Sequence, residues 1–247
     1  MKRSHFYTVI IGTEILNGRR EDKHFSFIRD ALSERGHPLF ASFTIKDDPH
    51  LIHTVFSLVK NDPYAVLFSF GGIGSTPDDL TRQIAADVFS DGVLSPHPQF
   101  CSDIIERFGE TAFPHRIHMA DLPKGAELLP NPINNMSGFA LEERYFFMPG
   151  FPEMSHPMTE YGLDRFYPHA PVTYRKTLLA YTSENTLIDV MEKLDSEIDF
   201  SSLPMINGGN PIVEISVASK DKIMCDTAFG MFISALRERS IPYEIRL

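Results

Sequence analysis

The chain has 247 residues, of which 43% are hydrophobic and 23% charged, which is ordinary for a protein with a packed core. Its formal net charge of −10 disfavours nucleic-acid binding, and no apolar segment is long enough to suggest a membrane span. Two cysteines, Cys101 and Cys225, are too few for a disulfide framework and indicate a reducing compartment. The amino-terminal residues lack a signal-peptide pattern, so we expect a cytoplasmic protein.

Strand-like and helix-like patterns alternate along the amino-terminal third of the chain. In chain order they predict a strand at 6–11, a helix around 25–32, a strand at 39–45, a helix at 49–59, a strand at 65–70 and a helix from Pro77. This order is typical of a parallel sheet with helices on both faces. Ligands of such sheets bind beyond the carboxyl ends of the strands, so the residues that follow the strands are the first candidates for a site.

The rest of the chain divides at a segment around residues 167–171, which has the composition of a linker. Before it, the pattern is mixed from Ser95 to Leu129 and predicts a short strand at 145–148. After it, the sequence predicts a strand at 176–181, a helix following Ser183, a hairpin around 207–210, a helix at 228–236 and a strand at 241–247. We therefore expect an α/β domain over residues 1–170 and a small ferredoxin-like α+β domain over residues 171–247.

A glycine-rich turn, Gly71-Gly72-Ile73-Gly74, lies between a predicted buried strand and a predicted helix. Glycines in such a turn let backbone N–H groups approach a ligand closely, and the start of a helix favours negative charge there. The turn lacks the Walker ending and the full dinucleotide fingerprint, so its spacing predicts a phosphate or similar anion and names no ligand. Basic residues such as Arg19, Arg20 and Arg82 are more often surface residues than phosphate clamps, and Arg82, within the predicted helix, is the one best placed to reach the anion.

Acidic residues occur at three predicted strand ends: Glu14, Asp47 and the pair Asp78-Asp79. Carboxylates beside an anion site usually imply a divalent cation between them and the ligand. Structural alternatives stand beside this interpretation. Asp79 fits the third position of a capping box that starts at Thr76, and Glu14 fits a solvated loop. Asp48 is the better helix cap of its pair, which leaves Asp47 for a ligand.

Five motifs in this order resemble the molybdopterin-binding (MoaB/Mog-like) domain in the form found at the amino terminus of CinA proteins. They are at residues 12–18, 46–49, 71–81, 119–126 and 148–154. The resemblance covers about residues 6–166, and the carboxyl-terminal part resembles the small domain that follows in CinA proteins. It implies a three-layer α/β/α domain with a mostly parallel sheet that binds a pterin or a nucleotide at the strand ends. It also implies a homo-oligomer, and the net charge and the lack of a long apolar segment predict no nucleic-acid or membrane partner.

The resemblance implies roles for particular residues. Asp47 and Asp79 would hold Mg²⁺ or another divalent cation, and together with Glu14 they would form the catalytic group. The expected ligand-binding residues are Gly71, Gly72, Gly74, Ser75, Thr76, Asp78, Thr81, Pro149, Gly150 and Glu153.

Three functions compete, and the first two follow from the resemblance. The first is metal-dependent cleavage of the pyrophosphate in ADP-ribose-like nucleotide diphosphates, and the second is non-catalytic binding of a pterin or nucleotide linked to molybdenum cofactor biosynthesis. The third is a purely interacting protein that keeps only the fold.

The chain departs from the family at Thr13, where aspartate is frequent, at Ser75 and Ser137, where proline is usual, and at Asn134, where glycine is usual. Asparagine tolerates a positive φ, so the turn at Asn134 can survive.

Overall fold

The computed structural model describes residues 4–169 and 172–246, and its contacts divide the chain into two compact units, Met1–Ala170 and Pro171–Leu247. Within the described ranges, every helix falls short of the length and apolar character that crossing a bilayer requires.

The elements of the first unit are β1 (His5–Ile11), α1 (Thr13–Leu16), α2 (His24–Glu34), β2 (Leu39–Ile45), α3 (Pro49–Lys60), β3 (Ala65–Phe70), α4 (Thr81–Phe89), β4 (Leu94–Pro96), α5 (Pro98–Phe108), η1 (Gly109–Ala112), η2 (Arg116–Ala120), β5 (Asp121–Pro123), β6 (Glu127–Leu129), β7 (Gly138–Leu141), β8 (Tyr145–Met148) and α6 (Pro152–Phe166).

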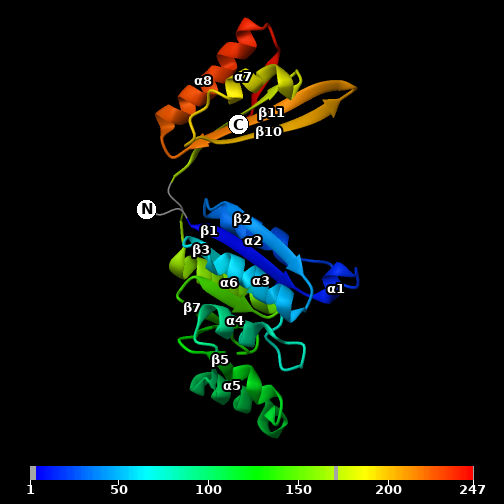
Figure 1. Cartoon of the computed structure of the whole chain (residues 1–247), viewed down its shortest axis with the longest axis vertical. Coiled ribbons are helices and arrows are strands. Elements are labelled where there is room, and N and C mark those ends of the chain that lie inside the picture. Colours follow the sequence, from blue (N-terminus) through cyan, green and yellow to red (C-terminus); the bar gives the residue numbers. More distant parts are fainter. Residues whose placement is uncertain (1–3, 170–171, 247) are drawn as a thin grey trace. The chain divides into compact units, whose positions relative to one another are not determined.

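A six-stranded sheet with the order β2-β1-β3-β8-β7-β6 forms the centre of the first unit (Figure 1). The first four strands in this order are parallel, whereas β7 and β6 join antiparallel. The register aligns the carboxyl ends, because Ile11 pairs with Ile45, Ile10 with Phe70, and Phe70 with Met148. The turns that follow β1, β2, β3 and β8 therefore leave the sheet at one edge.

Helices cover both faces of this sheet, as the alternating sequence pattern predicts (Figure 1). One apolar cluster packs α2 and α6 against one face, and a second packs α3, α4 and α5 against the other. All six residues of β3 are buried, which is the pattern of a strand covered on both sides. The three-layer α/β/α fold expected from the sequence is confirmed.

The predicted helix from Pro77 is wrong in its start, because α4 begins at Thr81. The N–H of Thr81 donates to the carbonyl of Gly72 (2.9 Å), so it is not available for the helical bond to residue 77. Residues 76–80 instead form a tight turn, in which the N–H of Asp79 donates to the carbonyl of Thr76 (3.0 Å).

The second unit has a four-stranded antiparallel sheet in the order β10-β11-β9-β12, with an apolar core between the sheet and its helices. Gly208 and Gly209 both have positive φ, at 57° and 85°, and they form the predicted hairpin turn. The expected helix after Ser183 is divided into two short pieces. The elements are β9 (Tyr174–Ala180), η3 (Glu184–Leu187), α7 (Ile188–Met191), β10 (Asp199–Asn207), β11 (Asn210–Ser219), α8 (Lys222–Glu238) and β12 (Tyr243–Arg246).

Candidate functional site

The carbonyl groups of the glycine turn after β3 point inward, and the first residues of α4 donate hydrogen bonds to them. The hydroxyl of Thr81 donates to the carbonyl of Gly71 (3.0 Å), and the N–H of Thr81 donates to that of Gly72 (2.9 Å). The Nη1 atom of Arg82 donates to the carbonyls of Ile73 and Gly74, the latter at 2.6 Å. Four consecutive acceptors are therefore satisfied from one side by the first two residues of α4.

The N–H groups of the same turn face the other way. A planar trans peptide points its C=O and the N–H of the following residue in opposite directions. The inward carbonyls of residues 71–74 thus turn the N–H groups of Gly72, Ile73, Gly74 and Ser75 outward. Within the part of the chain that the structure describes, these four N–H groups donate to no protein acceptor. A row of free amides of this kind is suited to an anion.

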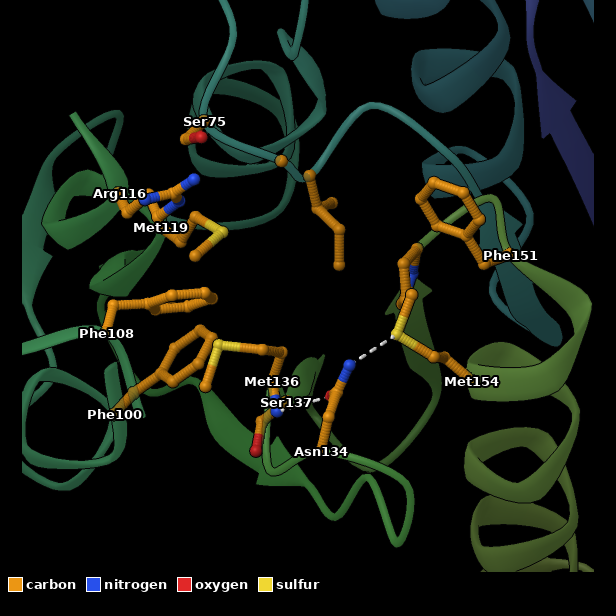
Figure 2. A pocket seen from close by; sticks show the side chains of 13 residues that line it. Ser75, Phe100, Phe108, Arg116, Met119, Asn134, Met136, Ser137, Phe151 and Met154 are labelled. Carbon is orange, nitrogen blue, oxygen red and sulfur yellow. Dashed lines mark hydrogen bonds between the residues drawn. The ribbon is translucent and has the colours of Figure 1, made fainter. Parts of the chain in front are cut away.

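A pocket of about 200 Å³ opens beside this row of amides (Figure 2). The turn contributes Ile73, Gly74 and Ser75 to one wall. Pro149, the residue after β8, also lines the pocket, and most of the remaining wall is apolar, which suits the flat ring of a pterin or a nucleobase. The remaining wall residues were not among the predicted binding residues, although Met119, Phe151 and Met154 fall in the family motifs and Asn134 and Ser137 at departures from the family. They are Phe100, Phe108, Arg116, Met119, Asn134, Met136, Ser137, Phe151 and Met154.

Asp47 and Asp79 each use one oxygen atom to hold a threonine. Asp47 Oδ2 accepts from the N–H (2.7 Å) and the hydroxyl (2.8 Å) of Thr13, which ties the end of β2 to the end of β1. Asp79 Oδ2 accepts from the N–H (2.8 Å) and the hydroxyl (2.6 Å) of Thr76. The bond from the N–H of Thr76 to the side chain of Asp79 is one of the two hydrogen bonds of a capping box. It does not cap α4, however, because the residue at the N-cap position of this helix is Leu80.

Neither Asp47 nor Asp79 lines the pocket, and a cation bound at these carboxylates would need a ligand to complete its coordination. Their Oδ1 atoms accept no hydrogen bond from the described residues, and no hydrogen bond or ion pair there joins Asp47 to Asp79. Among the described residues, no group of three or more His, Cys, Asp or Glu could hold a metal ion. Mg²⁺ is commonly bound by one or two carboxylates and completed by phosphate oxygens and water, so a divalent cation at these aspartates stays a prediction.

The other predicted residues occupy different positions relative to the pocket. Gly74, Ser75 and Pro149 line it, whereas Thr81 is completely buried beneath the turn. Gly150 packs against Gly71, where an added Cβ would lie 3.5 Å from its Cα. Asp78 and Glu153 are exposed, and Glu14 lies on α1, where its Oε1 is 4.0 Å from Nη1 of Arg20.

Arg82 does not reach outward to an anion, which corrects the expectation from the sequence. Its side chain is buried, with only 8% of the residue exposed, and its guanidinium binds the inward carbonyls. Burial lowers the pKa of Arg82, while the charges of Asp79 and Asp121 act in the opposite direction. Arg82 supports the turn from behind, and its Nε atom has no partner among the described atoms.

The turn around Asn134 does not depend on a positive φ at Asn134, as the sequence had suggested. The positive φ falls on Asn135, at 57°, and not on Asn134. The side chain of Asn134 instead accepts from the N–H of Met136 (3.0 Å) and contacts the sulfur of Met154 (3.2 Å; Figure 2). This link joins the pocket wall to the start of α6.

His24 packs behind the Pro149-Gly150 turn and should make stability depend on pH. It stacks on Phe70 at 4.5 Å and hydrogen-bonds the backbone of Gly150. Burial, and then the charge of His156, lower the pKa of His24 from 6.5 to about 4. Because the unfolded chain then takes up the proton first, the contribution of His24 to the free energy of unfolding should be fully present well above pH 6.5 and fall by roughly 3 kcal/mol between pH 6.5 and pH 4.

Urea unfolding at several pH values measures this effect. In His24→Phe, which keeps a flat ring beside Phe70 but cannot titrate, the decrease between pH 6.5 and pH 4 should be much smaller. An unchanged pH slope in this variant would show that other groups cause the decrease.

Comparison with known proteins agrees with this geometry. Residues 7–167 match a family model described as a probable molybdopterin binding domain. The chain is similar to a CinA-like protein of Nostoc punctiforme (31% identity over 159 residues, 62% of this chain and 38% of that protein). It is also similar to a CinA-like protein of Citrifermentans bemidjiense (34% over 157 residues, 61% and 37%). The chain thus spans well under half the length of these curated relatives.

A solved structure also shares the fold. It is the protein CinA with unknown function from Thermoplasma acidophilum, which is 24% identical in sequence and superimposes with a TM-score of 0.59. The match covers 66% of this chain and 98% of that chain. The family model matches well over half of the chain, and the row of free amides lies within the matched residues. The chain therefore belongs to the family of probable molybdopterin binding domains, in the form shared with CinA-like proteins.

Proposed function

We propose that the first unit binds a phosphorylated small molecule with a flat ring, a pterin phosphate or a nucleotide. The phosphate would lie on the amides of Gly72, Ile73, Gly74 and Ser75, and the ring would enter the adjoining apolar pocket. The outward row of four unpaired N–H groups carries this proposal, because buried or pocket-lining amides without a protein acceptor favour a ligand that supplies one.

We further propose that the ligand is a nucleotide diphosphate such as ADP-ribose, cleaved at its phosphoanhydride. Asp47 and Asp79 would hold a divalent cation, and Glu14 would assist. A bound cation supplies neutralisation of phosphate charge and orientation of water. The chain's own contribution is the row of amides, which positions the phosphate against the turn. The family resemblance adds a homo-oligomer, which size-exclusion chromatography with light scattering tests.

Titration calorimetry with ADP-ribose, AMP and adenosine, with and without Mg²⁺, tests the binding step. We expect the phosphorylated ligands to bind at least about 10-fold more tightly than adenosine, since charge-assisted bonds to the amides contribute more than about 1.4 kcal/mol. If neither AMP nor ADP-ribose binds more tightly than adenosine, the proposed phosphate site is wrong.

Release of AMP from ADP-ribose, followed by chromatography, tests the chemical step. Asp79→Asn keeps an oxygen that can accept from Thr76 but removes the charge, so it separates support of the turn from metal binding. We expect turnover to fall about 100-fold or more in this variant and to stay unchanged in Asp91→Asn, on the exposed surface. Binding without turnover in the unmodified protein would favour the alternative, a non-catalytic pterin or nucleotide binding module.

A further inference from the structure

We propose that Arg116 binds the anionic end of the ligand, an inference that rests on the proposed function of the same pocket. Arg116 belongs to η2 and lines the same pocket as the glycine turn. Figure 2 shows its guanidinium pointing toward the end of the pocket where Ser75 lies. The free N–H of Ser75 is the last of the outward amides, so the two kinds of donor meet at one end of the cavity.

The guanidinium of Arg116 is held in place while keeping donors free. It stacks on the ring of Phe108, with 4.7 Å from its Cζ to the ring centre, and its Nη1 atom donates to the carbonyl of Thr111 (2.9 Å). Within the described residues, Nε and Nη2 of Arg116 donate to no acceptor. An arginine fixed by stacking loses less freedom when it binds a phosphate, and two adjacent N–H groups match two phosphate oxygens.

The charge of Arg116 also lacks a protein partner. No carboxylate of the described chain lies within 4.0 Å of it, although the whole chain carries a net charge of −10. By contrast, Arg35 pairs with both Glu160 and Asp164. Of the 13 residues that line the pocket, Arg116 alone bears a charge. A ligand phosphate at the Ser75 end would supply the missing countercharge.

Arg107 provides a matched control on the same aromatic ring. Its Cζ lies 5.4 Å from the centre of the Phe108 ring, and its Nη1 donates to the carbonyl of Asn134 (3.2 Å). Arg107 does not line the pocket. The two arginines therefore share a stacking partner and an exposed position but differ in access to the cavity.

The experiment measures the affinities of AMP and of neutral adenosine for the full chain and for Arg116→Met, Arg116→Lys and Arg107→Met. We expect Arg116→Met to bind AMP about 10-fold or more weakly, Arg116→Lys to lie between, and Arg107→Met to match the unmodified protein. Adenosine affinity should stay the same in all of them. The AMP affinity of the unmodified protein should also decrease with salt more steeply than that of Arg116→Met.

Two results would overturn the inference while leaving the proposed function intact. One is an AMP affinity that Arg116→Met leaves unchanged. The other is an equal loss for AMP and adenosine, which would show that Arg116 only shapes the pocket. If the unmodified protein does not prefer AMP to adenosine, the proposed function itself fails, and this inference fails with it.

Discussion

Gly71→Ala is expected to destabilise the first unit by about 3 kcal/mol or more. Gly71 has φ +104°, and an added Cβ would lie 2.2 Å from the carbonyl oxygen of Ile11. Neither backbone can yield easily, because Ile11 is the last residue of β1 and the N–H of Gly71 donates to the carbonyl of Met148 (2.9 Å). Urea unfolding followed by circular dichroism measures the loss.

Gly18→Ala is the matched control for this substitution. Gly18 also has a positive φ, +75°, but an added Cβ there meets no atom within 4 Å. We expect only the backbone cost of the left-handed conformation, about 1 kcal/mol. An equal loss in the two variants would mean that the close approach of Gly71 to β1 contributes little to stability.

Arg82→Met should weaken binding of the phosphorylated ligand about 10-fold or more, although Arg82 does not face the pocket. Methionine fills part of the buried volume but donates nothing to the carbonyls of Ile73 and Gly74. These peptide groups would then lose their fixed orientation, and with it the outward direction of the amides of Gly74 and Ser75. Calorimetry with AMP and ADP-ribose measures the effect.

The same substitution should lower stability by roughly 2 kcal/mol. Each unsatisfied buried carbonyl costs about 1–3 kcal/mol, and removal of a buried cation that no carboxylate pairs offsets part of this cost. Arg82→Lys keeps the charge and an ammonium group that can donate to these carbonyls. Its affinity for AMP should therefore lie between those of the unmodified protein and of Arg82→Met. If Arg82→Met binds AMP as tightly as the unmodified protein, the orientation of the turn does not depend on Arg82.

Local patterns predicted the four parallel strands and the glycine turn because the information lies in neighbouring residues, whereas the antiparallel strands β6 and β7 were not predicted. The apolar run of β3 and the glycines after it specify a buried strand and a close turn without reference to the rest of the chain. The start of α4 was missed because a contact from Thr81 back to Gly72 decides it, and helix-start patterns do not contain such a contact. Arg82 was misplaced for a similar reason, since its burial depends on carbonyls eight and nine residues earlier.

Gly74, Ser75 and Pro149 were predicted, but most of the pocket wall was beyond the reach of sequence patterns. Phe100 and Phe108 have the spacing of core residues in α5, and Met154 has the same appearance in α6. They meet the glycine turn only in the folded chain, where α5 and the start of α6 line the same pocket. The residues next to Arg116 in the sequence, which include Pro114 and two histidines, do not predict that its side chain lines a cavity. Its stacking on Phe108 appears only in the folded structure.

The most direct test of the account is the backbone amide spectrum of ¹⁵N-labelled protein during titration with ADP-ribose. A phosphate on the turn should shift the N–H signals of Gly72, Ile73, Gly74 and Ser75 more than any others, because these groups would change from no protein acceptor to a charged one. Saturation of binding with these four signals unmoved would contradict the claim that the outward amides form the anion site.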